Sequence, residues 1–351
     1  ESLEGARDPD DLDVEHARQE LAVAHIKAGE YHTALLLLDA VLNVCVRVTG
    51  RQHLRVASAL NDIAIAHQNL GDLEIALKCF TQSLEIRRIV SAPKVLIAAS
   101  HANIATIHFK KGEVETALVS LSRAYKTTRL SLSDTDPASI AICKDLGCAY
   151  LACGDTERAL FHLRQALRVE IRVFGAMSTD VASTLNNVGL ALMQRGDHAD
   201  AIVRLQQALD MRLNLLGEHD PQVALTVKSI GAAYLTARNP RRALKYFKKA
   251  LSIEREAFAA SPMHLAPANT RFHMAKAYEK IGQTAKARAN YQAAGAVFSM
   301  RLGDTNLQAQ EAIFRANQLA IAPYENLRNV QTGFFEDEDE WDDQDEEWGD
   351  E

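Results

Sequence analysis

A short pattern, a glycine followed five positions later by an alanine, recurs along most of the chain at nearly constant spacing. It begins at Gly29, Gly71, Gly112, Gly154, Gly196 and Gly282, and one further copy carries Arg238 in place of the glycine. The intervals are 42, 41, 42, 42, 42 and 44 residues. A repeat of this length over most of a chain predicts a solenoid, in which each unit packs mainly against its neighbours.

Each unit reads as two helices joined at this glycine. In the fifth unit, apolar residues recur at helical spacing from Val181 to Leu192, and a second apolar series runs from Ala201 to Leu209. An Asp-Pro pair between units, as in "LGEHDPQVA", suits a helix end followed by a new helix. We therefore expect seven helix pairs over residues 13–322, which include a capping helix at 306–320, after an unstructured segment at 1–12.

Charge is distributed unevenly along the 351 residues, whose formal net charge is −7. Residues 336–351, "EDEDEWDDQDEEWGDE", contain 12 of the 46 acidic residues and none of the 39 basic ones, so the remainder carries about +5. A run of like charge this dense is typical of disorder. We expect a mildly basic body, a linker at 323–335 and a disordered acidic tail.

The spacing of small and aromatic residues in "GAAYLTARNPRRALKYFKKAL" (231–251) resembles the tetratricopeptide repeat. That resemblance implies an all-α fold, a right-handed superhelical solenoid whose first helices line a concave groove. Residues 181–231, with their Leu-Asn-Asn and Leu-Gly-x-x-His elements, are similar to the repeats of kinesin light chains. This second resemblance implies a non-enzymatic cytoplasmic adaptor that recognises cargo for microtubule transport and has a motor heavy chain as a partner.

Polar residues recur nine and ten positions before the turn, beside the apolar stripe. By the resemblance they would face a peptide in the groove, because an amide can donate to and accept from a peptide backbone and a lysine can attract an acidic ligand. Solvent exposure, or hydrogen bonds that fix the stacking of repeats, would also account for them. The candidate groove residues at these positions are Asn61, Asp62, Asn103, Lys144, Asp145, Asn186, Asn187, Lys228, Ser229 and His273, and Lys276, six positions before Gly282, is a further candidate.

The tail contains the tryptophans Trp341 and Trp348 among carboxylates such as Asp342 and Asp343. It resembles the tryptophan-acidic cargo motifs of kinesin light chain grooves, and tryptophan is enriched at binding hot spots. We therefore expect the tail to act as a pseudo-ligand, either in its own groove or in that of a neighbouring molecule. A solubilising tail whose tryptophans bind a separate partner, or an attached peptide, are the alternatives.

Several other classes of function are disfavoured. The chain has no phosphate-binding glycine loop, no HExxH and no GxSxG, so an enzyme is not expected. The five cysteines lack metal-like spacing, and His25, His67 and His108 share one slot that other units fill with tyrosine or leucine, which indicates packing. We expect no metal and no cofactor. The acidic tail disfavours nucleic acid.

Hydropathy predicts no membrane-spanning segment, and the acidic N-terminus does not resemble a secretory signal. These features favour the cytoplasm, with a cytoskeletal or ciliary association as an extension of the resemblance. Two alternatives to the cargo adaptor stay open. A co-chaperone that clamps acidic C-terminal peptides would need basic residues in neighbouring units, and a scaffold of a ciliary or cortical assembly would use the convex face and the ends.

Overall fold

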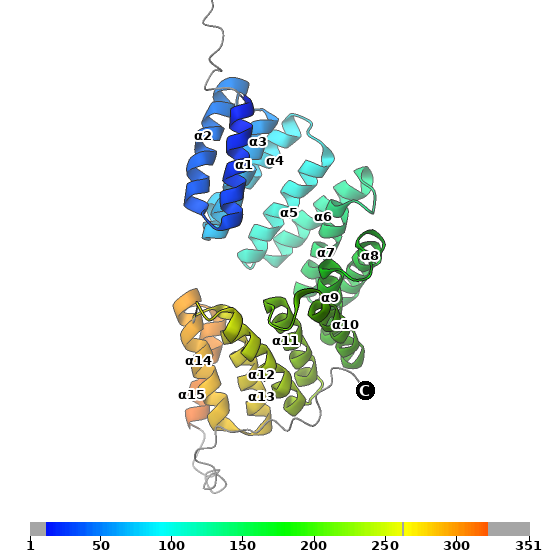
Figure 1. Cartoon of the computed structure of the whole chain (residues 1–351), viewed down its shortest axis with the longest axis vertical. Coiled ribbons are helices and arrows are strands. Elements are labelled where there is room, and N and C mark those ends of the chain that lie inside the picture. The colour runs from blue at the N-terminus through cyan, green and yellow to red at the C-terminus, as the bar shows by residue number, and fades with distance from the viewer. Residues whose placement is uncertain (1–11, 262, 322–351) are drawn as a thin grey trace, which may run out of the picture. The chain divides into compact units, whose positions relative to one another are not determined.

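The computed structural model describes residues 12–261 and 263–321, and all regular secondary structure in these ranges is α-helical (Figure 1). The helices are α1 Leu12–Ala28, α2 Tyr31–Thr49, α3 Leu54–Leu70, α4 Leu73–Ile89, α5 Lys94–Lys110, α6 Val114–Ser131, α7 Pro137–Ala152, α8 Thr156–Phe174, α9 Thr179–Arg195, α10 His198–Leu216, α11 Pro221–Thr236, α12 Pro240–Ala257, α13 Leu265–Ile281, α14 Thr284–Leu302 and α15 Leu307–Ile321. Trp341, Asp342, Asp343 and Trp348 lie outside the described residues. The expected all-α repeat fold is confirmed.

Consecutive helices pack as antiparallel pairs, α1 with α2 through α13 with α14, and α15 packs on α14. The chain divides into two compact units, Glu1–Ala257 and Phe258–Glu351, each described by itself below. The division falls at the longest step between pairs. Helix α13 begins at Leu265, eight positions after Ala257, whereas α11 begins at Pro221, five positions after Leu216.

Each helix pair turns at the predicted repeat position. The six turn glycines have positive φ, for example +100° at Gly196, a conformation that costs a glycine little because it has no Cβ. Arg238 adopts the same left-handed conformation with φ 61°, which is unfavourable for a residue with a side chain. The packing of the repeat therefore imposes the left-handed turn even where the residue is not glycine.

The core of each pair forms where a small residue of the first helix meets a large residue of the second. The small residue stands seven positions before the turn and the large one nine after it, as with Gly189 and Leu205, which is 0% exposed. A Cβ at Gly189 would lie 2.6 Å from Leu205 Cγ. The seven pairs are Ala22 and Leu38, Ala64 and Phe80, Ala105 and Leu121, Gly147 and Leu163, Gly189 and Leu205, Gly231 and Phe247, and Ala275 and Tyr291.

Helix α2 is long and apolar enough to cross a membrane by length and composition alone, so the hydropathy-based exclusion of such a segment was too strong. In the structure, Ala34, Leu38 and Val41 on one face of α2 are buried in the core. The same helix carries the exposed charged residues Asp39 and Arg47. In this fold, α2 serves as the second helix of the first pair.

Candidate functional site

Within the first unit, the first helices of successive pairs also approach one another. Helix α1 contacts α3, α5 contacts α7, α7 contacts α9 and α9 contacts α11, while the contacts made by the described even-numbered helices are chiefly with the odd-numbered helices on either side. Because the odd-numbered helices of successive pairs approach one another more closely than the even-numbered helices do, the stack curves toward the odd-numbered side. The exposed side of the odd-numbered helices therefore forms the inner, concave face of this unit. The residues nine positions before the turn lie along α3, α5, α7, α9 and α11. We call them the inner column: Asp62, Asn103, Asp145, Asn187 and Ser229.

Hydrogen bonds join the inner column across the first three odd-numbered helices. Gln19 Nε2 of α1 donates to Asp62 Oδ2 of α3 over 2.6 Å. Asn61 Nδ2 donates to Asp62 Oδ1 over 3.2 Å, and Asn103 Nδ2 of α5 donates to Asn61 Oδ1 over 3.0 Å. These polar residues thus hold successive repeats in register, as one of the sequence-based alternatives proposed.

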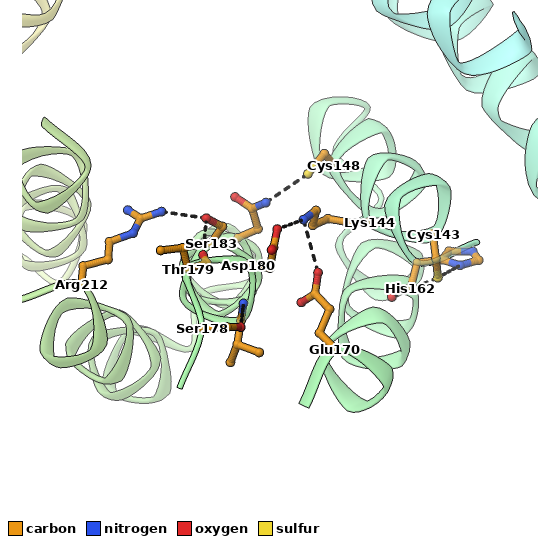
Figure 2. A network of polar contacts seen from close by, with 12 residues as sticks. Cys143, Lys144, Cys148, His162, Glu170, Ser178, Thr179, Asp180, Ser183 and Arg212 are labelled. Carbon is orange, nitrogen blue, oxygen red and sulfur yellow. Dashed lines mark hydrogen bonds and ion pairs between the residues drawn. The ribbon is translucent and has the colours of Figure 1, made fainter. Parts of the chain in front are cut away.

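The same kind of link joins α7 to α9. Asn187 Nδ2 lies 3.3 Å from Cys148 Sγ, and Lys144 Nζ lies 3.6 Å from an oxygen of Asp180. Figure 2 shows Lys144 lying between Asp180 and Glu170. The side-chain nitrogen of Asn187 is thus engaged, whereas its side-chain oxygen forms no hydrogen bond with the described residues.

The two candidate lysines form ion pairs inside their own helix pairs. Lys144 Nζ lies 3.2 Å from Glu170, and Lys228 Nζ lies 3.0 Å from Glu254, with a sequence separation of 26 in both cases. The glutamates are 1% and 2% exposed. Burial alone would lower the pKa of Lys144, but the Glu170 carboxylate, with Asp180 and Asp145, raises that pKa above its usual range. These lysines neutralise buried carboxylates and are not free to attract an acidic ligand.

Asparagine and arginine occupy the same two positions in other pairs. Asn186 stands 26 residues before Arg212, and Asn61 stands 26 before Arg87. Arg212 is 3% exposed and donates to Ser183 Oγ (3.1 Å), Thr226 Oγ1 and the Gln222 carbonyl, the first of which Figure 2 shows. Burial lowers the pKa of both arginines.

No ion pair of the described residues involves Arg87 or Arg212. Asn186 is 5% exposed, and its side-chain oxygen has no hydrogen-bond partner among them. The position ten residues before the turn therefore points into the helix pair at Lys144, Asn186 and Lys228, whereas Asn61 at the same position bonds to the inner column.

The structure thus separates the candidate residues. Asn61, Lys144, Asn186 and Lys228 stand ten positions before the turn, where they contact neighbouring helices or are buried, whereas Asp62, Asn103, Asp145 and Asn187 belong to the inner face. Ser229 is 7% exposed and donates to the Leu225 carbonyl. In the second unit, Lys276 pairs with Glu311 at 3.1 Å and lies over the Phe272 ring, which the His273 ring also contacts.

The inner column is acidic and amide-rich, with no cationic residue. The Asp145 side chain is exposed, but the surrounding protein atoms of the inner face partly desolvate its carboxyl group and raise its pKa. Lys144 acts in the opposite direction. Desolvation also raises the pKa of Asp62, while hydrogen bonds from Gln19 and Asn61 favour its charged form. The face can offer carboxylates and amide groups to a ligand.

Side chains that could support catalysis or bind metal have other contacts. His25, His67 and His108 place Nδ1 at 2.7, 3.0 and 2.7 Å from the acid that follows each turn, Glu30, Asp72 or Glu113, so these histidines do more than pack. Burial raises the pKa of the Cys143 thiol to about 12, which keeps it protonated and a poor nucleophile. Across residues 12–261 and 263–321, no three His, Cys, Asp or Glu residues are arranged to hold a metal ion.

Profiles of the tetratricopeptide repeat match residues 13–89, 96–169 and 180–256, and two further profiles match 144–214 and 270–298. These matches cover more than half of the chain. The chain belongs to the tetratricopeptide-repeat family. Membership implies the role of a protein-interaction adaptor, because such repeats present extended surfaces to partner proteins.

Similar proteins include a Clustered mitochondria protein homolog from Culex quinquefasciatus, 26% identical over 158 residues. The match covers 45% of this chain and only 12% of that relative's length. A solved Rap protein complexed with Competence and Sporulation Factor is 16% identical, with a TM-score of 0.60 over 88% of each chain. A putative kinesin light chain from Podosopora anserina is 19% identical over 59% of this chain and 96% of its own, with a TM-score of 0.49. At these identities, the likeness to solved structures concerns the fold alone.

Proposed function

We propose that this protein is a non-enzymatic adaptor that binds an extended segment of a partner protein along the inner face of its first unit. The observation that carries the proposal is the inner column, in which the amides of Asn103 and Asn187 alternate with Asp62 and Asp145 and so recur in every second repeat. An extended peptide presents N–H and C=O groups at regular intervals along its length. A ladder of amides on a stack of helices can bind such a strand by its backbone.

The hydrogen bonds between repeats prepare these amides for binding. Asn103 and Asn187 each use a side-chain nitrogen in a bond to the preceding odd-numbered helix, which fixes the orientation of the amide group. An amide has two N–H donors and an oxygen acceptor, so both groups retain capacity for a ligand. Because they are oriented before the ligand arrives, less conformational entropy is lost on binding.

The charge of the column favours basic or neutral side chains in the bound segment. Asp62 and Asp145 would attract lysine or arginine, whereas the lysines that suggested an acidic ligand are paired with Glu170 and Glu254. The resemblance to kinesin light chains favours tryptophan-containing acidic cargo and microtubule transport in the cytoplasm. The two peptide classes can be separated by experiment.

The test is selection of peptides from a displayed library against the full chain, followed by affinity measurement with the best binders. We expect enrichment of segments with basic residues. Alanine at both Asn103 and Asn187 should weaken binding by about 5- to 150-fold, because one or two net hydrogen bonds contribute about 1–3 kcal/mol in total. Enrichment of acidic tryptophan peptides would instead support the kinesin-like cargo class.

A matched control keeps the residue type and moves it off the inner face. Asn43 of α2 and Asn214 of α10 are exposed on even-numbered helices, so alanine at both should leave affinity unchanged. Equal losses in the two double variants, or none in either, would contradict binding along the inner column.

A further inference from the structure

The outer side of α6 and α8 carries a cluster of basic residues. Arg123 and Lys126 of α6 and Arg164, Arg168 and Arg172 of α8 are all exposed. Among the described residues, no ion pair involves any of these five, which we call the cationic patch. The three arginines recur at every fourth position, so they lie along one side of α8.

A hydrogen bond ties the two helices of the patch together. Tyr125 Oη of α6 lies 3.2 Å from Gln165 Oε1 of α8, and each residue is next in sequence to a member of the patch. The two helices belong to neighbouring repeats of the first unit. Lys126 and Arg168 both stand 14 positions after their turn glycines, Gly112 and Gly154, so the repeat places them on the same side of α6 and α8.

Large apolar side chains are exposed beside these charges. Val119 of α6 and Phe161 of α8 both stand seven positions after their turn glycines and are 52% and 64% exposed, and Ile171 is 44% exposed. Phe161 is one position from the fully packed core of its pair, where Leu160 is 2% exposed. A phenylalanine this exposed gives the surface an anchor for an aromatic ligand group.

Helix α12 provides an instructive contrast. Its exposed side also carries basic residues, including Arg241, Lys245 and Arg255, but no large apolar residue of α12 is among the exposed ones in the described part of the chain. A purely electrostatic ligand would find both helices suitable. A ligand that combines negative charge with aromatic rings should prefer α6 and α8.

We propose that the chain's own residues 336–351 bind the cationic patch of α6 and α8. That segment has 12 carboxylates to meet the five cations, and Trp341 and Trp348 to meet Phe161 and its apolar neighbours. The last helix ends at Ile321, so residues 322–335 separate it from the acidic segment. The inner column, which is itself acidic, would repel the segment.

Docking of this kind would mask the outer surface of the third and fourth pairs until a stronger ligand displaced the tail. It does not depend on the inner face, so this surface and the proposed peptide site can be tested separately. Charge attraction between exposed groups weakens with salt, because the Debye length falls from about 10 Å at 0.1 M to about 3 Å at 1 M.

The two tryptophans make the test direct, since they are the only ones in the chain and both lie in the acidic segment. Tryptophan emission from the full chain should be shifted to the blue of that from an isolated peptide of residues 336–351, and high salt should abolish the shift. Dilution should not change it if the tail binds its own body.

The variants Arg164→Glu/Arg168→Glu and Phe161→Ser should each return the emission to that of the free peptide, whereas Arg241→Glu/Lys245→Glu on α12 should not. All of these residues are exposed, and circular dichroism would verify that each variant folds. Emission identical to that of the free peptide in the unmodified chain would overturn the proposal. So would an equal effect of the α12 variant, or loss of the shift only when Asn103 and Asn187 are replaced by alanine.

Discussion

In α1–α6, the position seven residues before each turn holds alanine, and the position four before it holds a histidine bonded to the acid after the turn. In α7–α12 the first position holds glycine and the second holds Tyr150, Leu192 or Tyr234. Tyr150 stacks on His162 and Tyr234 on Tyr246, with ring centroids 5.6 and 5.3 Å apart. One repeat geometry is thus stabilised by polar contacts at the turn in one half of the first unit and largely by ring stacking in the other.

The second half also contains buried lysine–glutamate ion pairs. The Lys144–Glu170 and Lys228–Glu254 ion pairs belong to α7–α12, whereas the matching positions hold Asn61 and the buried Arg87 in α3 and α4, and Ala102 and Thr128 in α5 and α6. The comparison shows that all the repeats share the same backbone positions, whereas the side chains that make the contacts at those positions differ between repeats. Four predictions follow from these features of the repeat, from the largest expected effect to the smallest.

Replacing Lys228 with methionine should cost about 3–5 kcal/mol of folding free energy, because Glu254 would remain buried without its counter-charge. Urea unfolding followed by circular dichroism would measure the loss. The double variant Lys228→Met/Glu254→Leu should recover most of it, since an apolar pair of similar volume can replace a buried ion pair. A single variant as stable as the parent would show that the pair contributes little.

Lowering the pH should destabilise the first half through His101. Burial, aided by Arg88 and Arg123, lowers the pKa of His101 to about 4 from 6.5. Between these values the unfolded chain binds a proton that the folded chain does not, so stability is complete above about pH 6.5 and falls as the pH decreases toward 4. The loss contributed by His101 at pH 5 is about 2 kcal/mol.

The control for this prediction removes the titrating group. His101→Leu should abolish that part of the pH dependence, while His32→Ala, at an exposed histidine of α2, should keep it. Thermal unfolding of the three proteins at several pH values gives the comparison. Parallel pH profiles for the parent and His101→Leu would rule out His101 as the cause.

Exchanging the small residues tests how closely the helices approach in each half. Gly189→Ala should cost about 1–2 kcal/mol, because the overpacking against Leu205 outweighs the gain in helix propensity. The reverse change in the first half, Ala64→Gly, should cost about 1 kcal/mol through propensity alone. Denaturant midpoints would show whether the glycine positions in α7, α9 and α11 are the less tolerant, as the geometry indicates.

Arg238→Gly should give the smallest change, a gain below about 1 kcal/mol. The substitution relieves the left-handed conformation of Arg238, but the greater freedom of glycine in the unfolded chain offsets part of the benefit. A shift of the thermal midpoint by a few degrees is the measurement. A lower midpoint would indicate that the Arg238 side chain makes a stabilising contact greater than its strain.

The repeat made much of the fold predictable. All seven turn positions follow from one spacing, because a left-handed turn between two helices strongly favours glycine and the packed alanine after it tolerates little change. The same spacing could have revealed Gly50, Gly175, Gly217 and Gly303, which have positive φ where the second helices end. Because only four of the seven pairs carry them, these glycines give a weaker repeat signal than the turn glycines do.

The candidate site was less predictable. Two adjacent asparagines, Asn186 and Asn187, look alike in sequence, yet one is buried and the other belongs to the inner face. Successive residues of a helix point about 100° apart, so one residue's difference decides whether an amide is available to a ligand. The constant separation of 26 between Lys144 and Glu170 and between Lys228 and Glu254 was a usable signal, but reading it requires the relative rotation of the two helices.

The alternation of these buried partners limits how the chain can gain or lose repeats during evolution. A deletion of one unit, from Gly196 to Ala237, would set Asn186 against Glu254 and leave a buried carboxylate without a cation. A deletion of two units, from Gly154 to Ala237, would instead bring Lys144 to the same separation from Glu254 that Lys228 now has. We therefore expect this part of the chain to gain or lose repeats in steps of two helix pairs, which is twice the structural period.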